Sequence, residues 1–164
     1  IIRGRGILCR ELIKAQIKSP NYTNVYCCLI SIINSKIPEI GELLCKRIML
    51  SFQKAYRRNN KMQMKATIIF ISHLINFQVL IELVGLEILH LLLIKPTNDS
   101  IEVGIQLLLN TGQLLLKTSS KATKAILDLF REILQDNDGN TQISIRLQYD
   151  LEKLFDEYKK KFKN

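Results

Sequence analysis

The stretch AILDLFREIL, residues 125–134, carries the pattern that decides the fold class. Its apolar side chains recur at i, i+1, i+4 and i+5, and the charged side chains lie between them. This spacing is typical of an amphipathic α-helix with one buried face. The stripe consists of Ala125, Ile126, Leu129, Phe130, Ile133 and Leu134.

The C-terminal part of the chain repeats this pattern. Lysine and acidic residues separate its apolar positions, and four lysines follow at 159–161 and 163. Positive charge at that end stabilises a helix, because the last carbonyl groups carry the negative end of the helix dipole. The stripe consists of Leu147, Leu151, Leu154, Phe155, Tyr158 and Phe162.

Turn-forming residues divide the remaining chain into further helices. Pro38 followed by Glu39 and Glu42 indicates the first turn of a helix, where proline is tolerated and acids favour the positive end of the dipole. Residues 58–60, Arg-Asn-Asn, indicate a short polar hinge. Further breaks are expected at 19–21, 95–99, 118–120 and 136–140.

The chain is therefore predicted to be all-α, with about eight helices. Short connections favour antiparallel neighbours, and alternate helices begin about 40 residues apart, which is typical of a HEAT-type helical repeat solenoid. A plain helical bundle is the alternative architecture. The predicted helices span 5–18, 22–35, 39–57, 61–76, 79–94, 99–117, 121–135 and 142–162, and we treat 1–164 as a single domain.

The most apolar predicted helix, 79–94, is expected to be buried on nearly all sides. Glu82, Glu87 and His90 interrupt it, and it is too short to span a bilayer comfortably, so we expect no membrane partner. The chain begins with Ile1 and carries no signal pattern, which suggests a fragment of a longer protein.

Charge is distributed unevenly. Residues 1–65 contain thirteen Lys/Arg and three Asp/Glu, a net charge of +10, whereas residues 66–164 contain eleven and twelve, a net charge of −1. A basic half indicates an acidic partner or RNA, although a solvated basic face explains it equally well. With no tryptophan to stack on bases, any RNA contact would be a weak one through the phosphate backbone.

The sequence offers no catalytic or metal-binding cluster. His73 and His90 lie inside apolar helices, and no nucleotide-binding or nucleophile motif is present, so we expect no enzyme activity, no metal and no cofactor. None of the four cysteines forms a CxxC pair. We interpret Cys9, Cys27, Cys28 and Cys45 as small apolar residues in a reducing compartment.

If consecutive helices alternate in direction, their turns divide between two edges. The turns near 19–21, 58–60, 95–98 and 136–141 share the more polar edge, and those near 36–38, 77–78 and 118–120 share the other. Helical repeats commonly bind partners along such a row of turns. The candidate partner-binding residues are Arg57, Arg58, Asn59, Lys61, Lys95, Asn98 and Asp99, with Asp136 and Asp138 on the same edge.

Seven segments resemble the middle-domain family of eukaryotic initiation factor 4G, in its splicing branch. The resemblance is strongest in INSKIPEIGELL at 33–44. It also covers RGRGILCR at 3–10, SPNYTNVY at 19–26, YRRN at 56–59, HLIN at 73–76, LEIL at 86–89 and KPTNDSIEV at 95–103. These segments keep the family's order and spacing, and the resemblance weakens after Leu116.

The resemblance implies a scaffold for a DEAD-box RNA helicase. In the splicing branch, it implies binding of the helicase of the exon junction complex in an open, inactive state, recruitment to other spliceosome proteins, and a nuclear location. A translation-type helicase scaffold and direct RNA binding are the alternatives. The family also implies at least one helix before Arg3 and a second helical domain downstream. An apolar stripe through Ile7, Leu8, Leu12 and Ile13 is then expected to be uncovered here.

Overall fold

The computed structural model describes residues 2–135 and 143–161, and within them it confirms the all-α prediction. The chain divides into two compact units, residues 1–81 and 82–164. The helices of the first unit are α1 (Ile2–Lys18), the short 3-10 helix η1 (Pro20–Tyr22), α2 (Thr23–Lys36), α3 (Pro38–Arg57) and α4 (Lys61–Asn76). Those of the second are α5 (Glu82–Ile94), α6 (Asn98–Thr118), α7 (Ser120–Gln135) and α8 (Ile145–Lys161).

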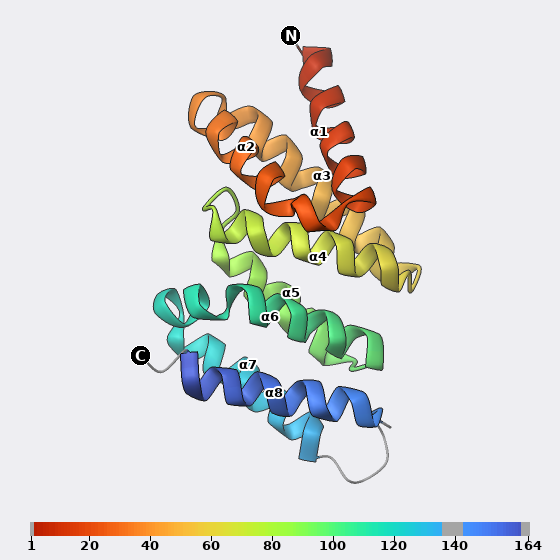
Figure 1. Ribbon diagram of the computed structural model, residues 1–164, viewed down its shortest axis with the longest axis vertical. Helices are drawn as coiled ribbons and strands as arrows, with labels where there is room; N and C mark the ends of the chain where they lie inside the picture. Colours follow the sequence, from red (N-terminus) through yellow and green to blue (C-terminus); the bar gives the residue numbers. More distant parts are fainter. Residues whose placement is uncertain (1, 136–142, 162–164) are drawn as a thin grey trace. The chain divides into compact units, whose positions relative to one another are not determined.

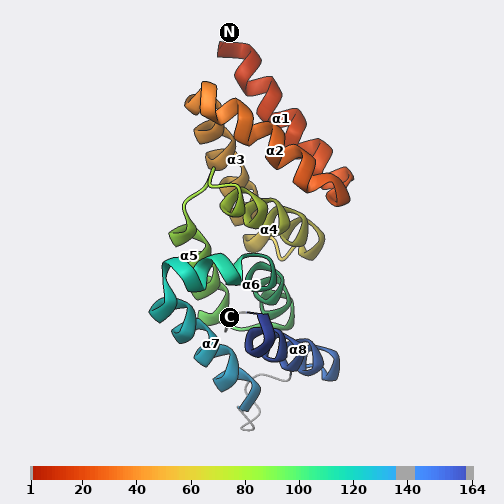
Figure 2. The ribbon, with the colours of Figure 1, turned by 60° about the vertical axis from the view of Figure 1, so that its left-hand side comes forward.

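In the first unit, successive helices reverse direction, so that α2, α3 and α4 zigzag beside one another (Figure 1). The α1–α2 and α3–α4 turns consequently lie at one end of the unit, and the α2–α3 turn and the end of α4 lie at the other (Figure 1). This agrees with the predicted sorting of these four turns. Helix α1 packs against α3 and α4 and runs beside α2 (Figure 2).

The turn between α2 and α3 depends on a close approach of the two helices. Ile37 donates its N–H to the Ile33 carbonyl oxygen and ends α2, and Pro38 then starts α3 at a position where its missing N–H is no loss. A β-carbon placed on Gly41 would lie 2.0 Å from Asn34 Oδ1 and 2.7 Å from Asn34 Cγ. Only glycine at 41 leaves room for this asparagine side chain.

A buried amide joins four elements of the first unit. The Gln16 side chain, from α1, is fully buried, and its Nε2 donates to the Ala66 carbonyl oxygen of α4 at 2.8 Å. The same Nε2 lies 3.2 Å from Thr23 Oγ1 of α2, and Thr23 in turn donates to the Pro20 carbonyl oxygen of η1 at 2.5 Å. Gln16 Oε1 is buried without a hydrogen-bond partner among the described residues, so only the Nε2 half of the amide is satisfied. Because breaking its two bonds would leave the whole buried amide unpaired, these bonds favour one arrangement of α1 against α4.

Three thiols occupy the interior of the first unit. Cys9, Cys27 and Cys45 are buried, whereas Cys28 is exposed, and all four are free. Burial, with Cys45 nearby, raises the pKa of Cys27 to about 12, and burial, with Cys9 nearby, raises the pKa of Cys45 to about 11. The buried cysteines therefore act as small apolar residues, as predicted.

The end of α4 explains why α5 starts later than expected. Gln78 has a positive φ of 57°, and Val79 donates its N–H to the Leu74 carbonyl oxygen, which completes a Schellman motif. Cys45 Sγ donates to the Val79 carbonyl oxygen at 3.8 Å. With residues 77–80 held in this cap, the next helix begins at Glu82 rather than at residue 79.

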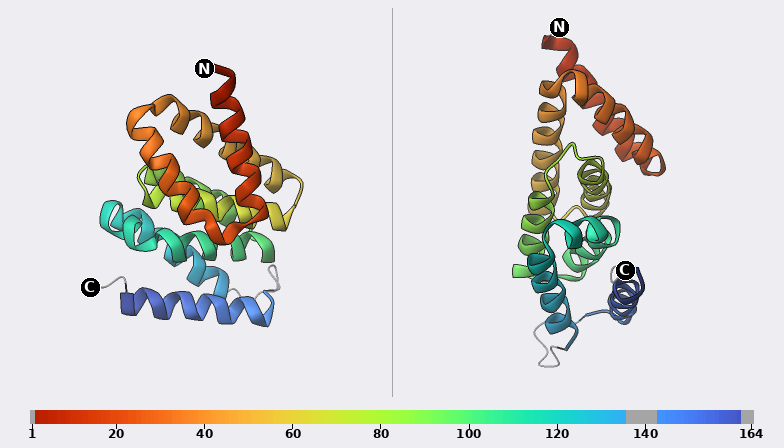
Figure 3. Two further views of the ribbon diagram at one scale, coloured as in Figure 1. Left: turned by 45° about the horizontal axis from the view of Figure 1, so that its top comes forward. Right: turned by 90° about the vertical axis from the view of Figure 1, so that its left-hand side faces the viewer.

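In the second unit, α6 is the central helix and packs against α5, α7 and α8 (Figure 3). A capping box starts α6, since Thr97 Oγ1 accepts from the Ser100 N–H at 3.1 Å and Ser100 Oγ accepts from the Thr97 N–H at 2.8 Å. A β-carbon on Gly104 would lie 3.2 Å from Phe130 Cζ, so this glycine lets the ring of α7 lie against the α6 backbone.

The predicted stripes of α7 and α8 are largely confirmed. Leu147, Leu151 and Leu154 are buried, while Phe162 lies outside the described residues. In α7, Ile126 and Phe130 are buried as expected. Leu127 is also buried, whereas Ala125 is exposed. The buried face of α7 therefore includes residues 126, 127 and 130 rather than starting at residue 125.

The expectation that the apolar helix after residue 79 is buried on nearly all sides is wrong. Leu83, Leu91 and Ile94 are 56%, 42% and 59% exposed, because α6 and α7 cover only one side of α5. Among the helices of the described chain, none has both the length and the apolar content needed for a membrane crossing.

We predict that Gly41→Ala lowers the free energy of unfolding by about 1–3 kcal/mol, because the new methyl group displaces the Asn34 side chain. Urea unfolding measures this change. Gly4→Ala is the matched control, since a β-carbon there meets nothing within 4 Å and alanine is the better helix former. In an Asn34→Ala background the penalty should shrink, and an unchanged penalty would contradict the proposed contact.

We also predict that one thiol of the native chain reacts rapidly with Ellman's reagent at pH 8, and that four react after denaturation. Thiolates are the reactive species, and the buried thiols stay protonated at this pH. Because an unfolded thiol ionises near about pH 8.5, these raised pKa values make stability fall as pH rises from there towards 12. Cys28→Ser should abolish the rapid phase, and a remaining rapid thiol would contradict the assignment.

Candidate functional site

The turn between α3 and α4 contains four of the predicted partner-binding residues, and its backbone is fixed. Asn59 has a positive φ of 50°, and its N–H donates to the Tyr56 carbonyl oxygen at 3.1 Å. The Asn60 N–H donates to the Ala55 carbonyl oxygen at 2.9 Å, which completes a Schellman motif at the end of α3. Asparagine tolerates the left-handed conformation better than most residues, which accounts for its presence at position 59.

Asn60 begins the next helix in the same turn. Its side-chain oxygen accepts the Gln63 N–H at 3.1 Å, and its carbonyl oxygen accepts the Met64 N–H at 2.9 Å. The sequence predicts a hinge at residues 58–60. The structure confirms a break between helices at these residues, since α3 ends at Arg57 and α4 begins at Lys61, with a helix C-cap joined directly to a helix N-cap.

The exposed side chains of this turn are mainly hydrogen-bond donors. Arg57 and Arg58 are exposed, and guanidinium groups only donate. The Asn60 side-chain oxygen already accepts the Gln63 N–H of the cap, so this exposed side chain has its amide hydrogens left to offer a partner. The first unit as a whole contains thirteen Lys/Arg and three Asp/Glu. The turn therefore suits a partner that supplies carboxylates or carbonyl oxygens.

A mostly apolar cavity of about 590 Å³ lies beside this turn. It is formed where the α1–α2 and α3–α4 turns meet at the same end of the unit, and Met62 at its rim is 82% exposed. We refer to the turn and this cavity together as the donor-turn site. The cavity is lined by Ile17, Pro20, Asn60, Met62, Gln63, Lys65, Ala66 and Ile69.

The cavity residues were missed by reasoning from the sequence. Met62 is an apolar residue in the first turn of a helix, between polar neighbours, and this is the one local signal that marks it. Nothing in the sequence pairs it with Ile17 and Pro20, because that contact depends on how α1 packs against α4.

The other predicted site residues belong to the second unit, at the start of α6. Lys95 is exposed, and Asn98 uses its side-chain oxygen to accept the Ser144 N–H at 3.4 Å. Asp99 is half-buried in the first turn of α6. Asp136 and Asp138 lie outside the described residues. The seven predicted residues thus fall into two groups on different units, and the first-unit group adjoins the cavity described above.

Both histidines lie within helices, as the sequence suggested, with His73 half-buried in α4 and His90 exposed on α5. Burial lowers the pKa of His73, which favours its neutral form, and His90 lies on the surface of α5. Within residues 2–135 and 143–161, no three His, Cys, Asp or Glu side chains lie together as metal ligands would.

The matched family fits this helical architecture. Residues 6–161 match the MIF4G domain, so the chain belongs to the MIF4G domain family and has its helical-repeat fold. The match confirms the resemblance to the middle domain of initiation factor 4G.

Relatives that align with the whole chain are splicing factors. The chain is 47% identical to a pre-mRNA-splicing factor CWC22 homolog of Drosophila melanogaster, 44% to cwc22 of Neurospora crassa and 43% to cwf22 of Schizosaccharomyces pombe, over 164 residues in each case. Each alignment includes 100% of this chain, but the chain spans only 12%, 16% and 18% of the length of those three proteins, respectively.

We predict that Asn60→Ala lowers the free energy of unfolding by about 1 kcal/mol, because the Gln63 N–H loses its cap. Asn60→Asp keeps an acceptor at this position and should retain the stability, while it adds a negative charge to the donor-turn site. Thermal unfolding followed by circular dichroism measures both. Equal losses for the two variants would contradict the capping role.

Proposed function

We propose that this chain is a scaffold domain of a pre-mRNA-splicing factor that binds the DEAD-box RNA helicase of the exon junction complex. The observation that carries the proposal is the 41–47% identity, over the whole chain, to proteins named CWC22 or cwf22. The family resemblance adds the helicase as the partner. A nuclear location and contacts with other spliceosome proteins follow from the same proposal.

The proposed mechanism is differential binding. A scaffold that binds the open arrangement of the two RecA lobes more tightly than the closed one raises the free energy of closing them. ATP and RNA favour closure, so they and the scaffold oppose each other through the same equilibrium. The effect of the scaffold on helicase affinity for nucleotide must then equal the effect of nucleotide on scaffold affinity.

The donor-turn site is the proposed contact with one lobe. Arg57 and Arg58 donate to carboxylates or carbonyl oxygens on the helicase, and Met62 and the cavity accept an apolar side chain. A preformed turn loses little conformational entropy on binding, which supports its use as an anchor. We assign Lys61 to the same contact, and Lys95, Asn98 and Asp99 to a separate one on the second unit.

Direct RNA binding is the second candidate, favoured by the net charge of +10 in the first unit. Such binding would come from phosphate contacts and would weaken steeply as salt rises. The helicase complex should depend less on salt, because apolar burial contributes to it. Single-stranded RNA titrated at 50 and 200 mM salt therefore separates the two functions.

We predict that isothermal titration detects binding of the helicase without nucleotide, and that a non-hydrolysable ATP analogue with RNA weakens it about tenfold or more, equivalent to about 1.4 kcal/mol. Arg57→Glu with Arg58→Glu should weaken binding at least as much, chiefly by repelling acidic groups on the partner.

The charge-matched control is Lys121→Glu with Lys124→Glu, two exposed changes on α7 in the other unit. It should leave helicase affinity within about twofold. If a folded chain does not bind the helicase, the proposed partner is wrong. If both double variants lose the same affinity, overall charge rather than the donor-turn site is responsible.

A further inference from the structure

The turn between α1 and α2 contains the chain's one serine that directly precedes a proline. Ser19 is followed by Pro20, whereas the other two prolines, Pro38 and Pro96, follow an isoleucine and a lysine. Ser19 is the N-cap of η1, yet its side chain makes no capping hydrogen bond. Its backbone, with φ of −138° and ψ of 71°, has already left the helical conformation, as is usual for a residue before proline.

The segment around Ser19 lies at the surface and can open locally. Ser19 is half-buried, Lys18 and Tyr22 are exposed, and η1 contains no buried residue. The Tyr22 N–H donates to the Ser19 carbonyl oxygen at 3.2 Å, and Thr23 donates to the Pro20 carbonyl oxygen. Because opening the turn breaks few hydrogen bonds and exposes no core residue, an enzyme that reads an extended peptide can reach the Ser19 hydroxyl.

This turn forms one wall of the donor-turn site. Pro20 lines its cavity together with Asn60 and Met62 of the facing turn. The α1–α2 turn lies at the same end of the first unit as the α3–α4 turn, which carries Arg57 and Arg58 (Figure 1). A group added to Ser19 is therefore one residue from the cavity lining.

The two walls of the cavity are also joined by the buried amide. Thr23 accepts from Gln16 Nε2 at 3.2 Å and donates to the Pro20 carbonyl oxygen, and Gln16 donates to the carbonyl oxygen of Ala66, which lines the cavity. This chain of hydrogen bonds holds the residue after Ser19 in a defined place relative to α4.

The sequence segments that form the donor-turn site contain no acidic side chain. The three acidic residues of the first unit are Glu11, Glu39 and Glu42. None occurs in 12–38 or in 43–81, so the side chains that carry charge at this site are lysines and arginines. A phosphate on Ser19, with a charge of about −1.5 to −2 at neutral pH, would be the one anionic side chain of these segments.

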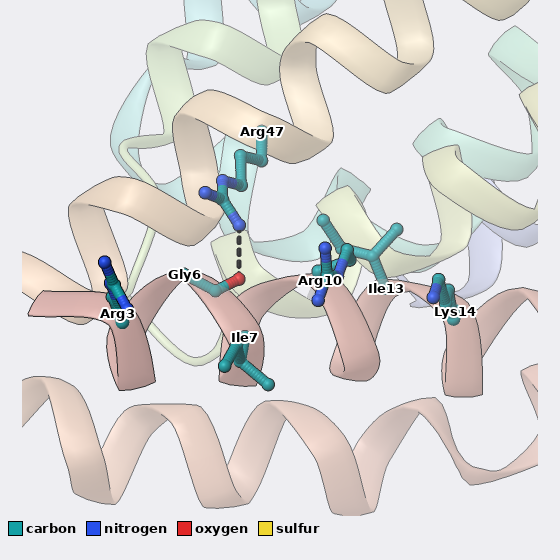
Figure 4. Close-up of a pocket in the computed structure, with 7 residues that line it drawn as sticks. All are labelled: Arg3, Gly6, Ile7, Arg10, Ile13, Lys14 and Arg47. Atoms are coloured by element: carbon teal, nitrogen blue, oxygen red, sulfur yellow. Dashed lines mark hydrogen bonds between the residues drawn. The ribbon is translucent and has the colours of Figure 1, made fainter.

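Ser19 does not lie on the open face of α1. Figure 4 shows that face, where Arg47 of α3 donates to the Gly6 carbonyl oxygen beside Arg10. Of the stripe that we expected to be uncovered, Ile7 is exposed, Leu8 and Ile13 are half-buried and Leu12 is buried. Ser19 follows Arg10 by nine residues, which is about two and a half helical turns, so it faces the opposite side of the helix.

We propose that Ser19 is a phosphorylation site for a proline-directed Ser/Thr kinase, and that phosphoserine at this position weakens binding at the donor-turn site. In the reaction, Ser19 Oγ bonds to the γ-phosphorus of ATP, the bond from that phosphorus to the β–γ bridging oxygen breaks, ADP leaves, and the hydroxyl proton passes to a base of the kinase. The phosphate offsets the positive charge of the site and repels carboxylates of the partner. This regulatory effect rests on the proposed function.

The first experiment tests the modification itself. The folded 164-residue chain is incubated with ATP and either a mitogen-activated protein kinase or a cyclin-dependent kinase, and the product is analysed by mass spectrometry. We expect one phosphate, on Ser19, and none on the Ser19→Ala variant. If neither kinase modifies Ser19 in the folded chain, the proposal is overturned.

The second experiment tests the effect on binding. The helicase without nucleotide is titrated with the unmodified and the phosphorylated chain, and circular dichroism verifies that both are folded. We expect phosphorylation to lower the affinity about fivefold or more at 50 mM salt, and the difference to shrink at 200 mM salt, because salt screens charge. Ser19→Glu, which adds a smaller charge, should lower it by a smaller factor.

The matched control is Ser35→Glu, which adds the same charge to an exposed serine at the other end of the first unit (Figure 1). It should leave the affinity within about twofold. Equal helicase affinity of the phosphorylated and unmodified chains would overturn the regulatory role. Failure of the unmodified chain to bind would contradict the proposed function and the regulatory role with it, while the mass spectrum still decides whether Ser19 is modified.

Discussion

The first unit depends on the contact between Asn34 and Gly41, where the Asn34 side chain of α2 lies directly against the α3 backbone. This approach sets the position of the neighbouring residues of α3. Glu39 pairs with Arg5, the Ile40 carbonyl oxygen accepts the Cys9 thiol at 3.7 Å, and Leu44 is fully buried. In the segment 33–44, which most resembles the family, neighbouring residues thus each make a different structural contact. Few single replacements at these positions would satisfy all of these contacts at once.

The sequence predicted where the helices lie, but less well how they end. Pro38 and the Thr97 cap have local chemistry that indicates a start, and both helices begin within one residue of the prediction. The caps at Asn59 and Gln78 were not predicted, because both positions adopt positive φ without the glycine that usually marks it. The exposed side of α5 was also missed. Its composition is apolar all round, and only packing determines which side α6 and α7 cover.

The sequence predicted which turns of the candidate site lie at the same end of the first unit, but it did not predict the cavity between them. Alternating helix directions place the turns near Pro20 and Asn60 at one end of the first unit, and that argument needs only helix lengths. The cavity between those turns depends on the Gln16 amide, whose partners lie seven and fifty residues away in sequence. The same holds for Arg47 of α3, whose guanidinium donates to the Gly6 carbonyl oxygen of α1, 41 residues away in sequence (Figure 4). Local sequence patterns do not predict contacts between segments that are distant in the sequence.

The paired caps of the α3–α4 turn have a mechanical consequence. Each backbone N–H from Arg58 to Asn60 has an acceptor within the turn, and the turn sits between two helices that share the same core. When two bodies join and their surfaces do not match, the more compliant one deforms. If the proposed partner binds at this turn, a stiff turn would leave the partner to deform wherever the two surfaces do not match. The turn would then act as a template for the shape of the complex.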